Sequence, residues 1–260
     1  MREPLRVERH NAVTVFTLDR PKVNAIDAET SRLMGEQFAA FSAEADARVA
    51  VVTGAGTRIF SAGWDLKAAA AGAHESDDYG LGGFAGILSL IRCNKPVIAA
   101  VNGIAIGGGV ELVLACDLVV AGRHTTFSFP EASLGNVADA GGTQLLPRRI
   151  PRALALELLY TGRAMPAAEA LRWGLVNNVV DSGTELAMAL RIAGRIAEGA
   201  PLSLQATKEL VRGTARMTEE QALTISTGDF PVYTKMLASL DHAEGPRAFA
   251  EKRVPRWQGR

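Results

Sequence analysis

Short apolar runs, each stopped by glycine, proline or a polar residue, characterise the first half of the chain. Residues 13–18 alternate between apolar residues and threonine, which predicts a strand. Further short runs have the length and β-branched content of buried strands, and segments of helical spacing lie between them. The predicted strands are 13–18, 49–53, 96–101, 118–121 and 126–129, and the predicted helices are 28–41 and 109–116. Strands that alternate with helices predict an α/β domain.

After about Pro151 the pattern becomes helical. Pro166 and Pro201 stand where helices would begin, and Gly174 stands where one would end. The last sixty residues contain no clear strand and are too few to build a strong core of their own. We therefore predict a main domain over residues 1–200 and a helical region over 201–260 that packs on the main domain or on another subunit. The predicted helices are 152–160, 166–173, 185–198 and 202–212.

Composition excludes some classes of protein. The 260 residues are 48% hydrophobic, and 28 basic residues balance 28 acidic ones, so the bulk charge of a nucleic-acid-binding domain is missing. No apolar run approaches the length of a membrane span, and the charged start does not resemble a signal peptide. The cysteines, Cys93 and Cys116, fit two buried thiols in a reducing compartment, so we expect a cytoplasmic protein. The four histidines have no metal-ligand spacing, and we expect no bound metal.

A run of three glycines, Gly107 to Gly109, follows a predicted strand and opens a predicted helix. The first amides of a helix have no partner within it, and they carry the positive end of the helix dipole. Such amides suit an anion, or an oxygen that becomes anionic during a reaction. The run is not a phosphate-binding P-loop, because the Lys and Ser/Thr of that motif are missing. Close packing of the helix on a strand explains the glycines equally well at this point.

Two glutamates are candidate functional residues. Glu111 lies about one helical turn beyond Gly108 with apolar neighbours, and a carboxylate in apolar surroundings needs a partner or a chemical task. Glu131 follows Phe129-Pro130 at a strand end, where functional side chains often collect. Taken alone, Glu111 is equally well explained as a helix-dipole residue, and Glu131 is better explained as an exposed loop acid.

Several motifs in one order change this balance. Together they closely resemble the crotonase (enoyl-CoA hydratase/isomerase) superfamily over nearly the whole chain. The motifs are FSAGWDL, KPVIAAVNGIAIGGGVEL, CDLVVA, FPEASLG, AGGTQLLP, YTGRAMPAAEALRWGLVN and EGPRAFAEKR. The resemblance implies an α/β fold with a spiral core of ββα units, and a C-terminal helical region through which subunits form trimers or dimers of trimers. Residues 1–200 would then be the catalytic core, and residues 201–260 the oligomerisation region.

Within this superfamily the sequence most resembles the carnitinyl-CoA dehydratases, through NAIDAETS, FSAGWDLKAAA, GGFAG and the tail EGPRAFAEKRVPRWQGR. It departs from them in NVADAGGTQ, where Ala138 replaces an expected proline and GGTQ is more typical of general enoyl-CoA hydratases. The resemblance implies a hydro-lyase that adds or removes water across the C2–C3 bond of an enoyl-CoA thioester. A general enoyl-CoA hydratase of fatty-acid or secondary metabolism is the alternative. An isomerase, or a non-catalytic member that binds acyl-CoA or RNA, fits less well because both glutamates are present.

The resemblance also assigns roles to residues. Glu111 would hold and activate water, Glu131 would exchange a proton at the substrate α-carbon, and the N–H groups of Ala62 and Gly108 would form the oxyanion hole. No cofactor is expected, because CoA is part of the substrate. The segments implied to line the substrate and CoA site contain Arg20, Lys22, Ala25, Ala62, Gly63, Trp64, Asp65, Leu66, Asp139 and Trp257.

Three of these assignments have open alternatives. Arg20 and Lys22 would pair with phosphates or remain solvated surface charges. Trp257 would lie near the adenine, from a neighbouring subunit, or simply pack the C-terminus. If the acyl group carries a trimethylammonium, Asp139 and the face of Trp64 are candidates to contact it, although Trp64 is equally well explained as an apolar wall.

Overall fold

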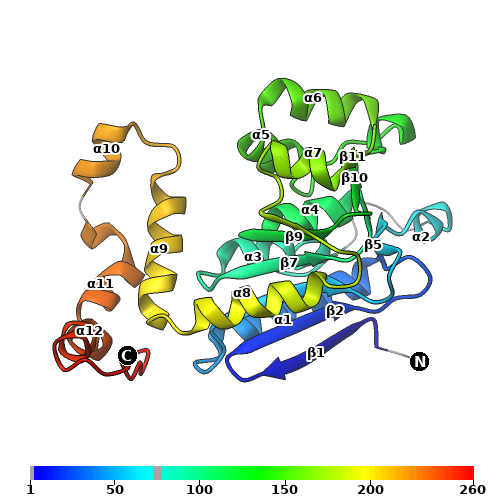
Figure 1. Cartoon of the computed structure of the whole chain (residues 1–260). Helices are drawn as coiled ribbons and strands as arrows, with labels where there is room; N and C mark the ends of the chain where they lie inside the picture. The colour runs from blue at the N-terminus through cyan, green and yellow to red at the C-terminus, as the bar shows by residue number, and fades with distance from the viewer. Residues whose placement is uncertain (1–2, 73–77, 226) are drawn as a thin grey trace.

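A six-stranded sheet forms the centre of the computed structural model, which describes residues 3–72, 78–225 and 227–260 (Figure 1). The N-terminal hairpin is antiparallel, and every other neighbouring pair in this sheet is parallel. Parallel strands in this order require crossovers through other elements, so the α/β architecture predicted from the sequence is confirmed. Across the sheet the strands are β1 (Leu5–His10), β2 (Val13–Leu18), β4 (Val49–Gly54), β7 (Val97–Val101), β9 (Leu118–Gly122) and β12 (Asn178–Val180).

Both faces of the central sheet are covered, and for this reason β2, β4 and β7 are buried at every residue. On one face, α8 (Glu185–Ala197) crosses β2, β4, β7 and β9 and closes a small cluster of valines, isoleucine and alanines (Figure 1). On the other face, α1 (Ala28–Ala43), α3 (Ile87–Arg92) and α4 (Gly108–Ala115) enclose the larger apolar core.

Two smaller sheets hold the segments that bear the predicted site residues. One has the order β11 (Met165–Pro166), β10 (Thr126–Ser128), β8 (Ile104–Ile106) and β5 (Ile59–Ser61). The other pairs β3 (Ala25–Ile26) with β6 (Gly63–Trp64). Because β5, β8 and β10 are neighbours, the chain segments that follow them emerge side by side. These segments lead into β6, α4 and the short helix η2 (Glu131–Leu134).

The remaining helices complete the core and form a C-terminal arm. Those of the core are α2 (Leu66–Ala70), η1 (Phe84–Gly86), α5 (Gly142–Arg149), α6 (Arg152–Thr161) and α7 (Ala167–Arg172). The arm consists of α9 (Pro201–Thr214), α10 (Glu219–Thr224), η3 (Thr227–Asp229), α11 (Pro231–Leu237) and α12 (Leu240–Ala250).

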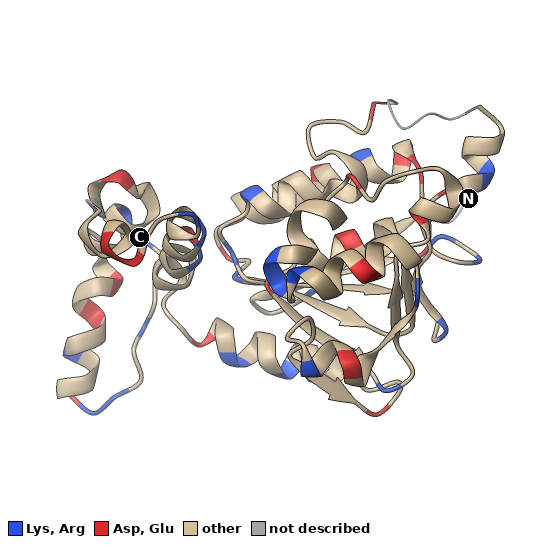
Figure 2. Cartoon of the chain, turned by 90° about the horizontal axis from the view of Figure 1, so that it is seen from above, with Lys and Arg blue, Asp and Glu red and all other residues tan. Residues whose placement is uncertain are grey.

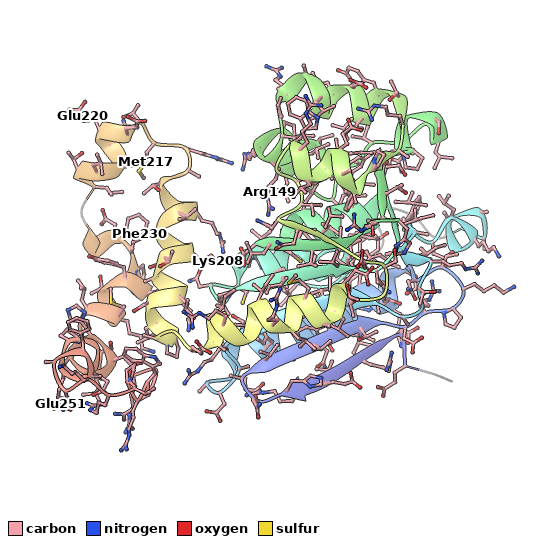
Figure 3. The ribbon with its side chains drawn as sticks, in the orientation of Figure 1. Arg149, Lys208, Met217, Glu220, Phe230 and Glu251 are labelled. Carbon is pink, nitrogen blue, oxygen red and sulfur yellow. The ribbon has the colours of Figure 1, made fainter. Side chains whose placement is uncertain are left out.

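The C-terminal arm lies beside the core rather than on it (Figure 1). Lys208 of α9 lies on the side of the arm that faces the core, and its Nζ contacts Asp117 at 2.7 Å and Lys95 O at 3.0 Å (Figure 3). Arm residues such as Leu223 and Phe249 are each 87% exposed. The division at residue 200 coincides with the start of α9, and the role of the arm in oligomerisation stays a prediction.

The structure confirms the predicted strands and helices to within two or three residues at their ends. It adds β1, whose sequence LRVERH was not recognised because five of its six residues are exposed and polar residues dominate it. Cys93 and Cys116 are both buried and free. None of the helices in the described part of the chain combines the length and apolar character needed to cross a bilayer. Acidic and basic residues are interspersed along the ribbon (Figure 2).

Candidate active site

A cavity of about 670 Å³ lies where the segments after β5, β8 and β10 meet. Glu111 and Glu131 both line it, although they are twenty residues apart on α4 and η2. Gly108, at the first turn of α4, lines it as well. The rest of the wall is mostly apolar, with Ile87 and Leu145 among its members. A concave, largely apolar site with a few convergent polar groups is typical of small-molecule binding.

Glu111 is buried, with 4% of its surface exposed. The N–H of Gly142, at the start of α5, donates to its Oε1 at 2.8 Å. Burial raises the pKa of Glu111 to about 7, and the negative charges of Glu131 and Asp139 add to this effect, whereas the amides of Gly142 and Ala140 oppose it. Its carboxyl group can therefore exchange a proton near neutral pH.

Glu131 opens η2, and its carboxylate packs against the backbone of Gly107. A Cβ atom on Gly107 would lie 2.4 Å from Glu131 Oε1, so this contact requires glycine. Within the described structure, Glu131 Oε2 is buried and has no hydrogen-bond partner, which leaves it able to act on a bound molecule. Burial raises the pKa of Glu131, and the charge of Asp139 raises it further.

The N-terminus of α4 supplies the amide of Gly108. Gly108 is the first residue of this helix, and the first amides of a helix lack partners within it. Gly63 of β6 lies directly against this amide, since a Cβ atom on Gly63 would come within 2.6 Å of Gly108 N. The positive φ of 74° at Gly63 also favours glycine. The two glycine-rich motifs of the sequence thus meet at one point of the cavity wall.

The prediction that the Ala62 N–H is an oxyanion donor is wrong, because this group donates to Val23 O at 3.0 Å. The next amides are also engaged: Gly63 N donates to Ser61 Oγ at 3.1 Å, and Asp65 N donates to Ile26 O at 3.1 Å. Because Asp65 N donates to β3 and neighbouring amides of a strand point to opposite sides, we expect the Trp64 N–H to point away from β3. Trp64 lines the cavity, and its amide is the better candidate to act with Gly108.

Asn24 and Ser61 hold this wall in place, and the sequence analysis did not single out either for this role. The Asn24 amide donates to the carbonyls of Ala55, Ile59 and Phe60 at 3.0–3.2 Å. Ser61 Oγ donates to Asn24 O at 2.7 Å. Asn24 stands in the motif NAIDAETS, but one sequence does not show that its side chain reaches back across a loop.

Arg20 forms salt bridges within the protein and does not line the cavity in the described structure. Its guanidinium contacts Asp65 and Asp27, each at 2.6 Å. Burial alone would raise the pKa of Asp65, but the hydrogen bond and charge of Arg20 and the amides of Lys67 and Ala68 hold it below its ordinary value. These contacts make Arg20 a tether between three segments, and its contact with a phosphate stays a prediction.

The other predicted residues fall into two groups. Leu66 and Asp139 line the cavity, and Ala25 lies beside it through its pairing with Gly63. Lys22 is exposed at the turn before β3, and its contact with CoA stays a prediction. Trp257 lies apart from the cavity wall, in the C-terminal arm, where its indole N–H donates to Glu198 O at 2.8 Å. This position favours packing of the C-terminus over a contact with adenine in the same subunit.

Two aromatic residues of the cavity were missed. Phe84 packs against Gly108, because a Cβ atom on Gly108 would meet its ring at 2.4 Å. Tyr79 packs edge-on against Phe84, with ring centroids 5.7 Å apart. Ala85, buried with a φ of 51°, fixes the backbone beside Phe84, and its N–H donates to Ser31 Oγ at 3.0 Å. The signal in the sequence was the motif GGFAG, whose aromatic residue is flanked by glycines.

Metal binding has no support in the described side chains, where no group of three or more His, Cys, Asp or Glu residues could hold an ion.

Comparison with known proteins agrees with this geometry. The family model described as enoyl-CoA hydratase/isomerase matches residues 8–260. The carnitinyl-CoA dehydratase of Salmonella arizonae is 50% identical over 260 residues, and that of Proteus mirabilis is 49% identical over 261, with 100% of each chain covered. The crystal structure of an enoyl-CoA hydratase from Mycobacterium tuberculosis superposes with a TM-score of 0.90 at 37% identity, covering 100% of both chains. A probable enoyl-CoA hydratase/isomerase from Mycobacterium abscessus gives 0.89 at 39%, again over 100% of both chains. The chain therefore belongs to the enoyl-CoA hydratase/isomerase family and has the crotonase fold.

Proposed function

We propose that this enoyl-CoA hydratase-type enzyme interconverts a 3-hydroxyacyl-CoA and the corresponding 2-enoyl-CoA, with carnitinyl-CoA as its 3-hydroxyacyl thioester. The observation that carries the proposal is that the buried Glu111 and the half-buried Glu131 line one cavity beside the first amide of α4. The identity of about 50% to carnitinyl-CoA dehydratases over the full chain supports the choice of substrate.

In the hydration direction, the thioester oxygen would accept hydrogen bonds from the N–H groups of Gly108 and Trp64. These donors stabilise the negative charge that develops on that oxygen as the enolate forms, and each such donor typically lowers the barrier by ~3–4 kcal/mol. The helix dipole of α4 acts in the same direction. CoA enters as part of the substrate, so no further cofactor is required for this step.

The carboxyl groups divide the proton transfers. Glu111 orients the water, accepts one of its protons as the oxygen bonds to C3, and Glu131 delivers a proton to C2. The pair holds one proton before and after the reaction, so the two groups act as one unit. Burial raises the pKa of both carboxyl groups, that of Glu111 to about 7, so the pair is suited to exchange protons near neutral pH.

The test is an assay of purified protein with crotonobetainyl-CoA and crotonyl-CoA, following the loss of absorbance of the conjugated thioester. Glu111→Gln and Glu131→Gln should each lower kcat by about 10²–10⁴-fold, the usual contribution of a general acid or base. Glu36→Gln, an exposed residue of α1, is the matched control and should not change kcat. Full activity in both active-site variants would exclude this mechanism and favour a non-catalytic, acyl-CoA-binding role.

A general enoyl-CoA hydratase is the second candidate, favoured by the apolar side chains of Ile87, Leu88 and Leu145 on the cavity wall. Such a wall suits a plain alkyl chain. A higher kcat/KM with crotonyl-CoA than with crotonobetainyl-CoA would favour this candidate.

A further inference from the structure

The charged residues that line the cavity all have the same sign. The acidic residues are Glu111, Glu131 and Asp139, and none of the described lining residues is Lys, Arg or His. The chain as a whole has equal numbers of acidic and basic residues, so this bias belongs to the cavity and not to the composition. An uncompensated group of like charges in a partly enclosed space favours a ligand of opposite charge.

Asp139 differs from the two glutamates in position. It is exposed, whereas Glu111 is buried and Glu131 is half-buried. It lies in the loop between η2 and α5, so it borders the cavity from the solvent side. The negative charge of Asp139 raises the pKa of both Glu111 and Glu131. Asp139 thus adds a negative charge close to the catalytic pair, where a neutral acyl group would gain nothing from it.

Aromatic rings line the same cavity. Trp64, Tyr79 and Phe84 come from three separate segments, β6, the loop before η1, and η1 itself. The faces of such rings attract cations, and they do so most strongly where the cation is partly desolvated. A combination of aromatic faces and a carboxylate recognises quaternary ammonium groups, which cannot donate N–H hydrogen bonds and depend on these contacts.

Covalent geometry fixes where such a cation would lie. In a 4-trimethylammonio-2-enoyl thioester, the nitrogen is two bonds from C3, the carbon to which water adds. If Glu111 and Glu131 flank the C2–C3 bond, the cation must lie beside the catalytic pair, on the side away from the thioester. It cannot reach a distant subsite, so the groups that recognise it have to be members of this cavity.

We infer that Asp139 selects acyl groups that carry a quaternary ammonium at C4, and that aromatic side chains of the same cavity contact the methyl groups of that cation. This inference rests on the proposed function and adds the specificity-determining residues to it. Asp139 supplies the charge that distinguishes a cationic acyl group from an alkyl group of the same shape. The aromatic and aliphatic wall accepts the methyl groups of either.

The experiment uses pairs of ligands that differ only in charge. Crotonobetainyl-CoA and 5,5-dimethylhex-2-enoyl-CoA have the same shape, because a tert-butyl group replaces the trimethylammonium. Their saturated counterparts, 4-trimethylammoniobutanoyl-CoA and 5,5-dimethylhexanoyl-CoA, cannot react and serve as competitive inhibitors. Inhibition by this second pair reports recognition without the electronic effect of the ammonium on the double bond.

Wild-type protein is expected to prefer the cationic inhibitor by about tenfold in Ki, the scale of one partly desolvated charge contact. Asp139→Asn should reduce this preference to about twofold, and Asp139→Glu should retain most of it. Asp46→Asn removes an exposed carboxylate from the loop before β4 and is the matched control, with an unchanged preference. The ratio of the two inhibitors cancels any general effect of a variant on CoA binding.

Equal inhibition of the wild-type protein by the two saturated thioesters would overturn the inference, and so would an unchanged preference in Asp139→Asn. The comparison of the two saturated thioesters on wild-type protein does not depend on whether any variant folds. Hydration of both unsaturated thioesters at similar kcat/KM would leave the hydratase activity intact while removing the cation selectivity. Hydration of neither would instead contradict the proposed function itself.

Discussion

Glu111 illustrates how neighbours decide the chemistry of a residue. The carboxyl group is 4% exposed, accepts a hydrogen bond from Gly142 at 2.8 Å, and shares its cavity with Glu131 and Asp139. Burial outweighs the hydrogen bond, so the neutral form is favoured up to about pH 7, where the pKa of Glu111 lies. A group of this kind has consequences for stability as well as for catalysis.

Glu111→Gln should stabilise the folded protein at high pH. The pKa of Glu111 is raised from 4.5 to about 7 on folding, so its contribution to stability is complete below pH 4.5 and is lost as the pH rises to about 7. Gln does not titrate, so the Glu111→Gln variant should avoid this loss, which amounts to about 3 kcal/mol in the free energy of unfolding. Urea unfolding at pH 5 and pH 8 measures this, with Glu36→Gln as the control. An equal dependence on pH in wild type and Glu111→Gln would contradict a raised pKa.

Asp139→Asn should shift the acid limb of the pH–rate profile to lower pH. The negative charge of Asp139 raises the pKa of both glutamates, so its removal makes the ionised form easier to reach. In the wild type, kcat/KM for hydration should fall as the pH drops below about 7, because the ionised carboxylate activates the water. The profile is measured with crotonyl-CoA, so that no substrate charge intervenes. An acid limb at the same pH in Asp139→Asn and in the wild type would show that the charge of Asp139 does not affect the pKa values of Glu111 and Glu131.

At the scale of elements, the site depends on how closely β6 approaches the first turn of α4. Gly63 and Gly108 are in contact, and Asn24 and Ser61 hold the loop behind them. This approach places two segments, more than forty residues apart in the sequence, so that their amides can act on one oxygen.

Gly63→Ala should lower kcat by about 10²-fold or more, the effect of losing one oxyanion donor. The added methyl group would come within 2.6 Å of Gly108 N and force the two segments apart. Gly56→Ala is the matched control, because Gly56 also has a positive φ, of 85°, but nothing lies within 4 Å of its Cβ position. Both variants should lose about 1 kcal/mol of stability from the left-handed backbone. Equal kcat in the two variants would exclude the proposed role of this contact.

At the scale of the whole molecule, the C-terminal arm leaves large apolar side chains exposed. Leu223 and Phe249 are each 87% exposed and Val254 is 82% exposed, whereas in the described core Leu81, at 91%, is the one large apolar side chain exposed to this degree. The arm contacts the core through a few polar groups, among them Lys208 (Figure 3). Apolar residues exposed in such number are typical of a surface that another chain covers.

The family resemblance implies trimers or dimers of trimers, so light scattering of the purified protein should give three or six times the mass of one chain. Phe249→Ser should reduce the population of the assembly, since it places a polar residue on the exposed face of α12. Tyr160→Ser is the control on the core, at a residue that is 72% exposed. A monomeric wild-type protein at micromolar concentration would contradict this prediction.

The sequence by itself determined the class of fold, most element positions and the two glutamates. These features depend on local periodicity, on turn residues and on motifs that keep their order along the chain. Only the tertiary structure showed that Ala62 donates to Val23, that Arg20 is held by Asp27 and Asp65, and that Phe84 lies on Gly108. Each of these contacts joins segments distant in sequence, and neither the direction of an amide nor the partner of a charge is fixed until the chain has folded.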